Sequence, residues 1–131
     1  MSHAAHKLRR AYAEARLSDV SIEYNTDPMS VVRQAESEKV LHKFKPDIVY
    51  CAYKTKYDNS DAVRIIFTML LPGPATGSSA SSEIVMSIVS FLEELFLPLD
   101  HIEFMREVKG KKKNIAILSI IKKEREGEDP I

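Results

Sequence analysis

Residues 48–71, IVYCAYKTKYDNSDAVRIIFTMLL, carry the clearest structural pattern in the chain, because two apolar runs flank a short polar segment. The runs at residues 48–56 and 62–71 are rich in β-branched and aromatic residues, a composition typical of strands. The segment between them, YDNSD, has the composition of a turn. In the second run Phe67 falls on one face and Ile66 on the other. The stretch therefore predicts a hairpin whose second strand lies in the middle of a sheet.

The chain after this stretch contains one clear helix followed by two more strand patterns. Apolar residues recur at helical spacing from Ile84 to Phe96, after serines that can cap the helix and before Pro98, which ends it. Residues 101–108 alternate polar and apolar side chains, and residues 115–121 form a last apolar run. We expect these two strands to form a second hairpin, joined by a lysine-rich turn.

The chain before residue 48 predicts two helices and one strand. Alanine, leucine and charged residues at 4–17 favour a helix by intrinsic propensity. Residues 19–24, DVSIEY, alternate polar and apolar side chains, which is the pattern of a strand with one solvated face. Asp27 followed by Pro28 is a strong helix start, and the apolar positions after it follow a helical face as far as Phe44. The second helix is therefore expected to end just before the next proline.

The predicted order of elements is α, β, α, β, β, α, β, β, which is an α+β fold. Without the first helix and the last strand, this is the βαββαβ order of the ferredoxin-like fold, an antiparallel sheet with two helices on one face. The alternative is a sheet in which two hairpins flank a central helix, the layout of roadblock-like scaffolds. The two differ in whether residues 19–24 pair inside the sheet. We expect the ferredoxin-like arrangement, with an N-terminal helix and an extra C-terminal strand added.

A chain of 131 residues is the size of one domain, and 44% apolar with 29% charged residues is the composition of a globular protein. We expect a helical extension at residues 1–17, a single α+β domain at residues 18–123 and an acidic tail at residues 124–131. The single cysteine, Cys51, excludes an intramolecular disulfide and favours a reducing compartment. No signal-like segment or apolar run of membrane-spanning length occurs, so the expected location is intracellular, in the cytoplasm or nucleus, without a membrane span.

Basic and acidic residues number 19 each, so no global field points to nucleic acid and any such site must be local. The first candidate is the turn of the second hairpin. Four lysines surround Gly110 there and could bind the phosphates of RNA or of another polyanion: Lys109, Lys111, Lys112 and Lys113. The alternative is that the glycine permits the turn and the lysines keep the hairpin tip solvated.

A second group of basic residues lies in the N-terminal third of the chain. Arg9 and Arg10 are the candidate anion-binding residues of the first helix, beside Lys7 and Arg16. Further basic residues follow on and after the second helix: Arg33, Lys39, His42, Lys43 and Lys45. These groups could join the lysine turn in one surface, or they could form the solvent faces of two helices. The spacing alone does not choose between the two.

No arrangement of residues typical of catalysis can be named in the sequence. Cys51 has no neighbouring histidine, and its apolar strand suggests a small core residue. Residues 73–79, GPATGSS, precede a helix but lack the lysine of a phosphate-binding loop. No spacing of histidines, cysteines or carboxylates suits a metal. We therefore expect a non-enzymatic binding module without a metal or a cofactor.

Two helices can protect one face of such a sheet, so the other face or an open edge is left for a partner. The first hypothesis is an assembly module that binds itself or another protein through its sheet, at positions such as Ile117. The second is an RNA-binding module that uses the lysine hairpin, with strand tyrosines as surfaces for base stacking: Tyr24, Tyr50, Tyr53 and Tyr57.

Overall fold

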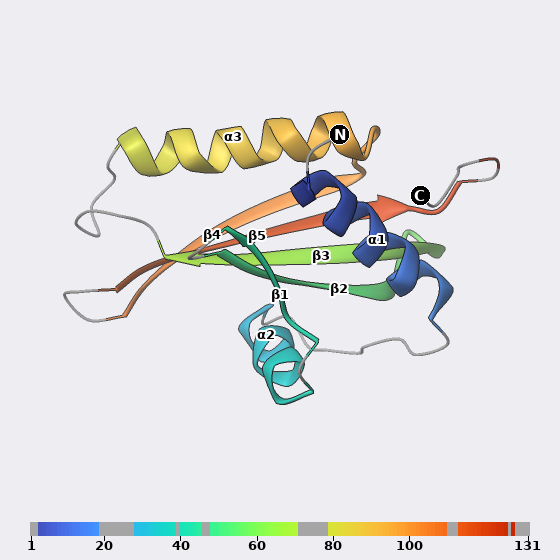
Figure 1. Ribbon diagram of the computed structural model, residues 1–131, viewed down its shortest axis with the longest axis horizontal. Helices are drawn as coiled ribbons and strands as arrows, with labels where there is room; N and C mark the ends of the chain where they lie inside the picture. Colours follow the sequence, from blue (N-terminus) through green and yellow to red (C-terminus); the bar gives the residue numbers. More distant parts are fainter. Residues whose placement is uncertain are drawn as a thin grey trace.

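The computed structural model describes residues 3–18, 28–38, 40–45, 48–70, 79–109, 113–125 and 127. Within these residues there are three helices: α1 (His3–Leu17), α2 (Pro28–Ser37) and α3 (Ser79–Leu95). Five strands of the same residues form one antiparallel sheet: β1 (His42–Lys45), β2 (Ile48–Tyr57), β3 (Ser60–Leu70), β4 (His101–Lys109) and β5 (Lys113–Lys123). Their order across the sheet is β1-β2-β3-β5-β4 (Figure 1). The expected α+β class is confirmed. None of the described helices combines the length and apolar character needed to cross a membrane.

The central hairpin forms as the sequence predicts. β2 and β3 pair without interruption, and Asp58 and Asn59 connect them. Both connecting residues have positive φ, 49° and 62°, the left-handed conformation of a two-residue hairpin turn that Asp and Asn tolerate. β3 is hydrogen-bonded to β2 on one side and to β5 on the other, and Val63, Ile66 and Phe67 are almost fully buried. The prediction of a strand in the middle of the sheet is confirmed.

Helices cover both faces of the sheet (Figure 1). On one, which we call the α1/α3 face, apolar side chains of α1 and α3 meet those of β2, β3 and β5 in the larger core cluster. Its most deeply buried members include Leu8, Tyr50, Phe67, Leu92 and Leu118. The opposite face, which we call the α2 face, carries a smaller cluster. In this cluster Val31, Val32 and Ala35 of α2 pack against four residues of the sheet: Cys51, Tyr53, Ile66 and Ile117.

The ferredoxin-like arrangement is wrong. In that fold the first strand of the motif lies beside the third, but here both sides of β3 are already paired, with β2 and with β5. No position beside β3 is left for residues 19–24, which themselves lie outside the described residues. The two helices expected on one face, α2 and α3, lie on opposite faces, and α1 shares a face with α3 instead. In chain order the β2–β3 and β4–β5 hairpins flank α3, as the alternative layout has it, and in the sheet the two hairpins lie side by side.

The second helix is shorter than predicted. It ends at Ser37, and His42–Lys45 forms β1 instead of a last helical turn. Phe44 fits the helical pattern, but its ring packs against the rings of Phe67 and Phe91, with centroids 6.0 Å and 5.6 Å away. Strand pairing with β2 and these aromatic contacts outweigh the local helical pattern.

Candidate functional site

β4 is the outermost strand on one side of the sheet and presents an open edge. It pairs along its length with β5, and no described strand pairs with its other side. Three of its apolar side chains are exposed: Ile102 by 39%, Phe104 by 46% and Met105 by 40%. Ile102 and Phe104 lie opposite Ile120 and Leu118, and therefore on the α1/α3 face. We call the free side of β4, with its three exposed apolar side chains, the β4 edge.

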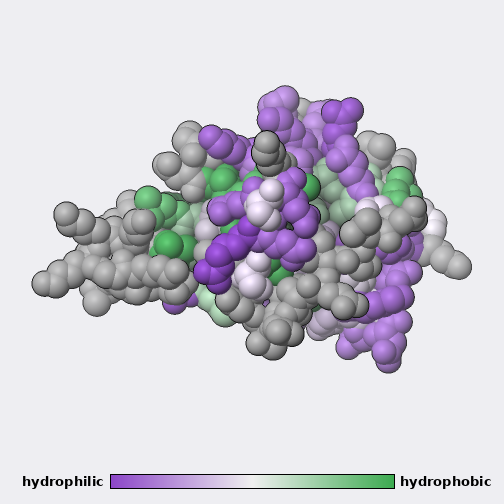
Figure 2. All heavy atoms as spheres, turned by 90° about the horizontal axis from the view of Figure 1, so that it is seen from below, coloured by the Kyte–Doolittle hydropathy of each residue, from purple (hydrophilic) through white to green (hydrophobic). Residues whose placement is uncertain are grey.

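Exposed apolar surface continues from β4 onto the α2 face. Met105 lies opposite Ile117, which packs under α2. At the same end of the sheet the exposed Leu70 lies opposite the half-buried Ile115. Figure 2 shows this face, with apolar atoms in green to the left of the polar surface that fills its middle. α2 therefore leaves apolar side chains uncovered on this face.

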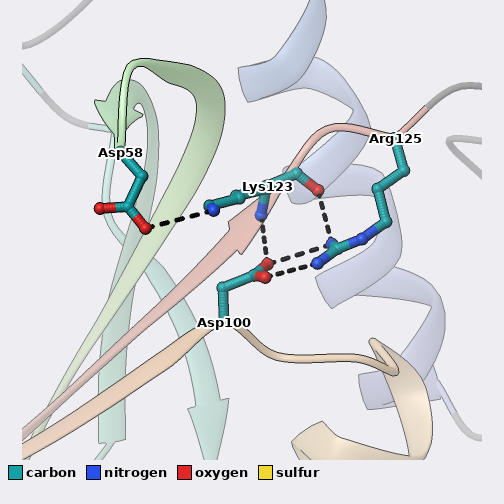
Figure 3. Close-up of polar contacts among 4 residues, drawn as sticks. All are labelled: Asp58, Asp100, Lys123 and Arg125. Atoms are coloured by element: carbon teal, nitrogen blue, oxygen red, sulfur yellow. Dashed lines mark hydrogen bonds and ion pairs between the residues drawn. The ribbon is translucent and has the colours of Figure 1, made fainter.

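A set of polar contacts fastens the start of β4 to the end of β5 (Figure 3). The carboxylate of Asp100 accepts a hydrogen bond of 2.7 Å from the backbone N–H of Lys123, and the guanidinium of Arg125 donates to both of its oxygens. The ammonium of Lys123 lies 3.3 Å from the carboxylate of Asp58. Burial acts to raise the pKa of Asp100, but the hydrogen bonds from Arg125 and Lys123 outweigh burial and hold the pKa below its usual value.

The opposite edge of the sheet, β1, is short and polar. Phe44 is its apolar anchor, while His42 and Lys43 are exposed. The ring of His42 stacks on the ring of Tyr50 in β2, with centroids 5.1 Å apart and planes inclined by 25°. Between this edge and α1 lies a pocket of about 240 Å³. We call it the α1/β1 pocket, and its lining is Lys7, Arg10, Ala11, Glu14, His42, Lys43 and Tyr50.

The structure places the lysine turn only in part. Lys109 and Lys113 lie opposite each other at the end of the β4–β5 hairpin, which confirms that the hairpin forms. Lys111 and Lys112 lie outside the described residues, as do the side chains of Lys109 and Lys113. The interpretation of this turn as a phosphate-binding site stays a prediction.

The second basic group is divided by the fold. Arg10 meets His42 and Lys43 around the α1/β1 pocket, although these residues are far apart in the sequence. Arg9 is half-buried and does not line this pocket, and Arg33 lies on α2, on the other face of the sheet. Sequence reasoning considered Tyr50 only as a stacking surface for use with the lysine hairpin, and it did not consider Glu14. No spacing could have found them, because the pocket is lined by residues of three elements.

Cys51 is buried beneath α2, which confirms its interpretation as a core residue. Burial raises the pKa of its thiol to about 11, so the thiolate that a nucleophile requires is scarce at neutral pH. Among the described residues, no three or more histidines, cysteines or carboxylates are grouped as a metal ion would require.

The comparisons with known proteins give no match: no family model fits the chain, and no curated protein and no solved structure resembles it closely enough to match. What the protein binds is therefore inferred from the β4 edge and the α1/β1 pocket alone.

Proposed function

We propose that the protein is a non-enzymatic binding module that forms a homodimer by antiparallel pairing of two β4 strands. The observation that supports this proposal is the β4 edge itself. It offers nine residues of regularly paired strand with three exposed apolar side chains, and no described strand covers it. Natural sheets usually shorten, charge or bulge such edges, because free N–H and C=O groups beside apolar side chains pair with other chains.

Two-fold symmetry restricts how two copies of β4 can pair. In an antiparallel pair, residues directly opposite each other lie on the same face of the sheet, so the symmetry axis passes beside one residue. An axis at Glu103 or at Arg106 would place two like charges opposite each other, which is unfavourable. An axis at Phe104 instead places the largest exposed apolar side chain of β4 opposite its own copy.

The register centred on Phe104 also gives acceptable neighbours. It sets Ile102 of one copy opposite Arg106 of the other on the α1/α3 face, and Glu103 opposite Met105 on the α2 face. The stem of an arginine packs readily against an apolar side chain while its charged end stays in water. The two Phe104 rings would contribute about 0.5–1.5 kcal/mol beyond the area they bury. The result is one antiparallel sheet that continues across both copies.

Cross-linking tests both the dimer and its register. Side chains directly opposite each other in an antiparallel pair have Cβ atoms about 4.5–5.5 Å apart, near the separation that a disulfide spans. We expect Phe104→Cys to form a covalent dimer under mild oxidation. Met86→Cys is the matched control, because Met86 is an exposed apolar residue on α3, at 61%, away from β4. The buried Cys51 should not react in either variant.

Light-scattering mass of the unmodified chain, at low and high salt, completes the test. A dimer whose mass changes little with salt, together with cross-linking of Phe104→Cys and not of Met86→Cys, supports pairing through β4. A monomer at protein concentrations of about 1 mM rules out the proposal. So does equal cross-linking of the two variants, since random collision would then explain the covalent product.

A further inference from the structure

The α1/β1 pocket lies at the edge of the sheet opposite to β4 and is independent of the proposed dimer. Helix α1 supplies Lys7, Arg10 and Glu14, β1 supplies Lys43, and β2 supplies Tyr50 as the most deeply buried of the lining residues. The volume of about 240 Å³ is a little below the range of roughly 300–1,000 Å³ typical of small-molecule sites. The pocket therefore suits a compact ligand.

Tyr50 is the feature that distinguishes this pocket from a solvated basic surface. The residue is 1% exposed, and its hydroxyl has no hydrogen-bond partner in the part of the chain that the structure describes. Buried hydroxyl groups are normally paired, and Tyr50 is one of the residues that line the pocket, so a ligand bound there can supply the missing partner. Burial, and then the nearby Glu14 carboxylate, raise the pKa of this hydroxyl, so it stays protonated and can donate a hydrogen bond.

The charges around the pocket indicate what that partner is. Lys7, Arg10 and Lys43 are cationic and Glu14 is the single carboxylate, which leaves an excess of two positive charges when His42 is neutral. The chain as a whole has a formal net charge of zero, so this excess is a local concentration. A phosphomonoester carries about −1.5 to −2 charges near pH 7 and three strong acceptor oxygens. Lysine, arginine and tyrosine hydroxyl groups are donors that suit those oxygens.

We propose that the α1/β1 pocket binds a small phosphorylated polyol, such as a sugar phosphate. The phosphate oxygens accept hydrogen bonds from the basic side chains and from the hydroxyl of Tyr50. Glu14, the acceptor in the lining, takes a hydrogen bond from a hydroxyl group of the organic part. The same carboxylate repels a bare anion, so the pocket prefers the polyol phosphate over inorganic phosphate.

Titration calorimetry with glycerol 3-phosphate tests the proposal, with inorganic phosphate and glycerol as separate arms. We expect binding of glycerol 3-phosphate, weaker binding of phosphate and none of glycerol. Lys43→Gln should weaken the binding about tenfold, because one charge-assisted hydrogen bond is lost. Lys56→Gln is the matched control, since Lys56 is an exposed lysine on β2 that contacts Asp61 and does not line the pocket. It should leave the affinity unchanged.

Tyr50→Phe separates ligand binding from folding. The substitution removes a hydroxyl that has no partner in the described residues, so the melting temperature should stay the same or rise. The affinity for glycerol 3-phosphate should fall about fivefold or more. No binding at about 10 mM ligand overturns the proposal. Equal losses in Lys43→Gln and Lys56→Gln would overturn it as well, because the attraction would then be a general charge effect.

Discussion

The two edges of the sheet differ in length, regularity and side-chain chemistry. β1 has four residues, and its pairing with β2 shifts register between Lys43 and Lys45. β4 has nine residues, keeps an unbroken register with β5 and exposes apolar side chains. Short and bulged edges resist pairing with other chains, whereas long regular edges that expose apolar side chains invite it, and β4 exposes three such side chains among charged ones. One edge of the sheet therefore borders a polar pocket, and the other carries the surface that we propose for assembly.

The largest expected difference concerns two phenylalanines, one at each edge. Phe44 packs among the rings of Phe67 and Phe91, whereas Phe104 is exposed. Phe44→Ala should lower the free energy of unfolding by about 3 kcal/mol, because it leaves a cavity beneath β1. Phe104→Ala should lower it by less than about 1 kcal/mol. Urea denaturation of the monomer, at low protein concentration, measures both. Equal losses would remove the distinction between a packed edge and an open one.

A charge at the β4 edge should weaken assembly without unfolding the chain. Phe104→Glu places two carboxylates opposite each other in the proposed dimer, and we expect the dissociation constant to rise by at least ~30-fold, about 2 kcal/mol. Met86→Glu changes an exposed apolar residue on α3 in the same way and should leave association unaffected. Sedimentation equilibrium distinguishes the two. If both variants dissociate alike, net charge and not the β4 edge controls assembly.

The basic residues of the β4–β5 turn and those of the α1/β1 pocket can be compared through RNA binding. The triple variant Lys111→Glu/Lys112→Glu/Lys113→Glu changes three lysines of the β4–β5 turn. It should lower the affinity for a short single-stranded RNA by about tenfold at low salt and make that affinity less dependent on salt. The double variant Lys7→Glu/Lys43→Glu in the α1/β1 pocket is the control, with little effect expected. Fluorescence anisotropy at two salt concentrations measures both. If the control loses the binding and the triple variant keeps it, the turn is a solvated hairpin tip.

The smallest expected effect concerns the hydrogen bonds of Asp100 with Lys123 and Arg125, just before β4 begins. Asp100→Asn keeps the shape but loses the charge that attracts Arg125, and should lower the free energy of unfolding by about 1–2 kcal/mol near pH 7. Asp58→Asn is the control, because Asp58 is exposed and its contact with Lys123 should contribute at most about 0.5 kcal/mol. Thermal unfolding of both variants measures the difference.

The pH dependence of the same contact follows from the lowered pKa of Asp100. A carboxyl group whose pKa is lower in the folded chain stabilises the fold fully above its unfolded-state pKa of about 3.9. That contribution disappears as the pH falls through the folded-state pKa. The stability of Asp100→Asn and of the unmodified chain should therefore converge in acid. A difference that stayed constant from pH 7 to about pH 2 would show that the carboxylate charge contributes nothing.

Much of the sheet could be predicted from local pattern. Both hairpins follow from alternating or continuous apolar runs on either side of a polar turn, and Asp58 and Asn59 are residues that tolerate the conformation which the first turn requires. The buried position of β3 follows from apolar side chains on both of its faces. Each of these inferences depends on residues that are near one another in the chain.

The errors come from contacts between distant residues. Phe44 continues the helical spacing of α2, and nothing in its neighbourhood indicates that the rings of Phe67 and Phe91 will draw it into a strand. The apolar stripe of α2 is compatible with either face of the sheet, so the pattern could not show that α3 takes the opposite one. Of the candidate anion-binding residues, Arg10 lies at the α1/β1 pocket, and sequence reasoning chose it for its charge and not for its neighbours in the fold.

The order of residues is thus enough to specify the hairpins, the central strand and the positions of the basic groups, because short-range periodicity and turn chemistry act within a few residues. The face that each helix covers depends on the whole chain. The open β4 edge also depends on the whole chain, as does the pocket that brings Tyr50, Lys43 and Arg10 together. Packing joins residues far apart in sequence, and among competing arrangements the chain adopts the one of lowest free energy, in which the burial of apolar surface is the dominant favourable contribution.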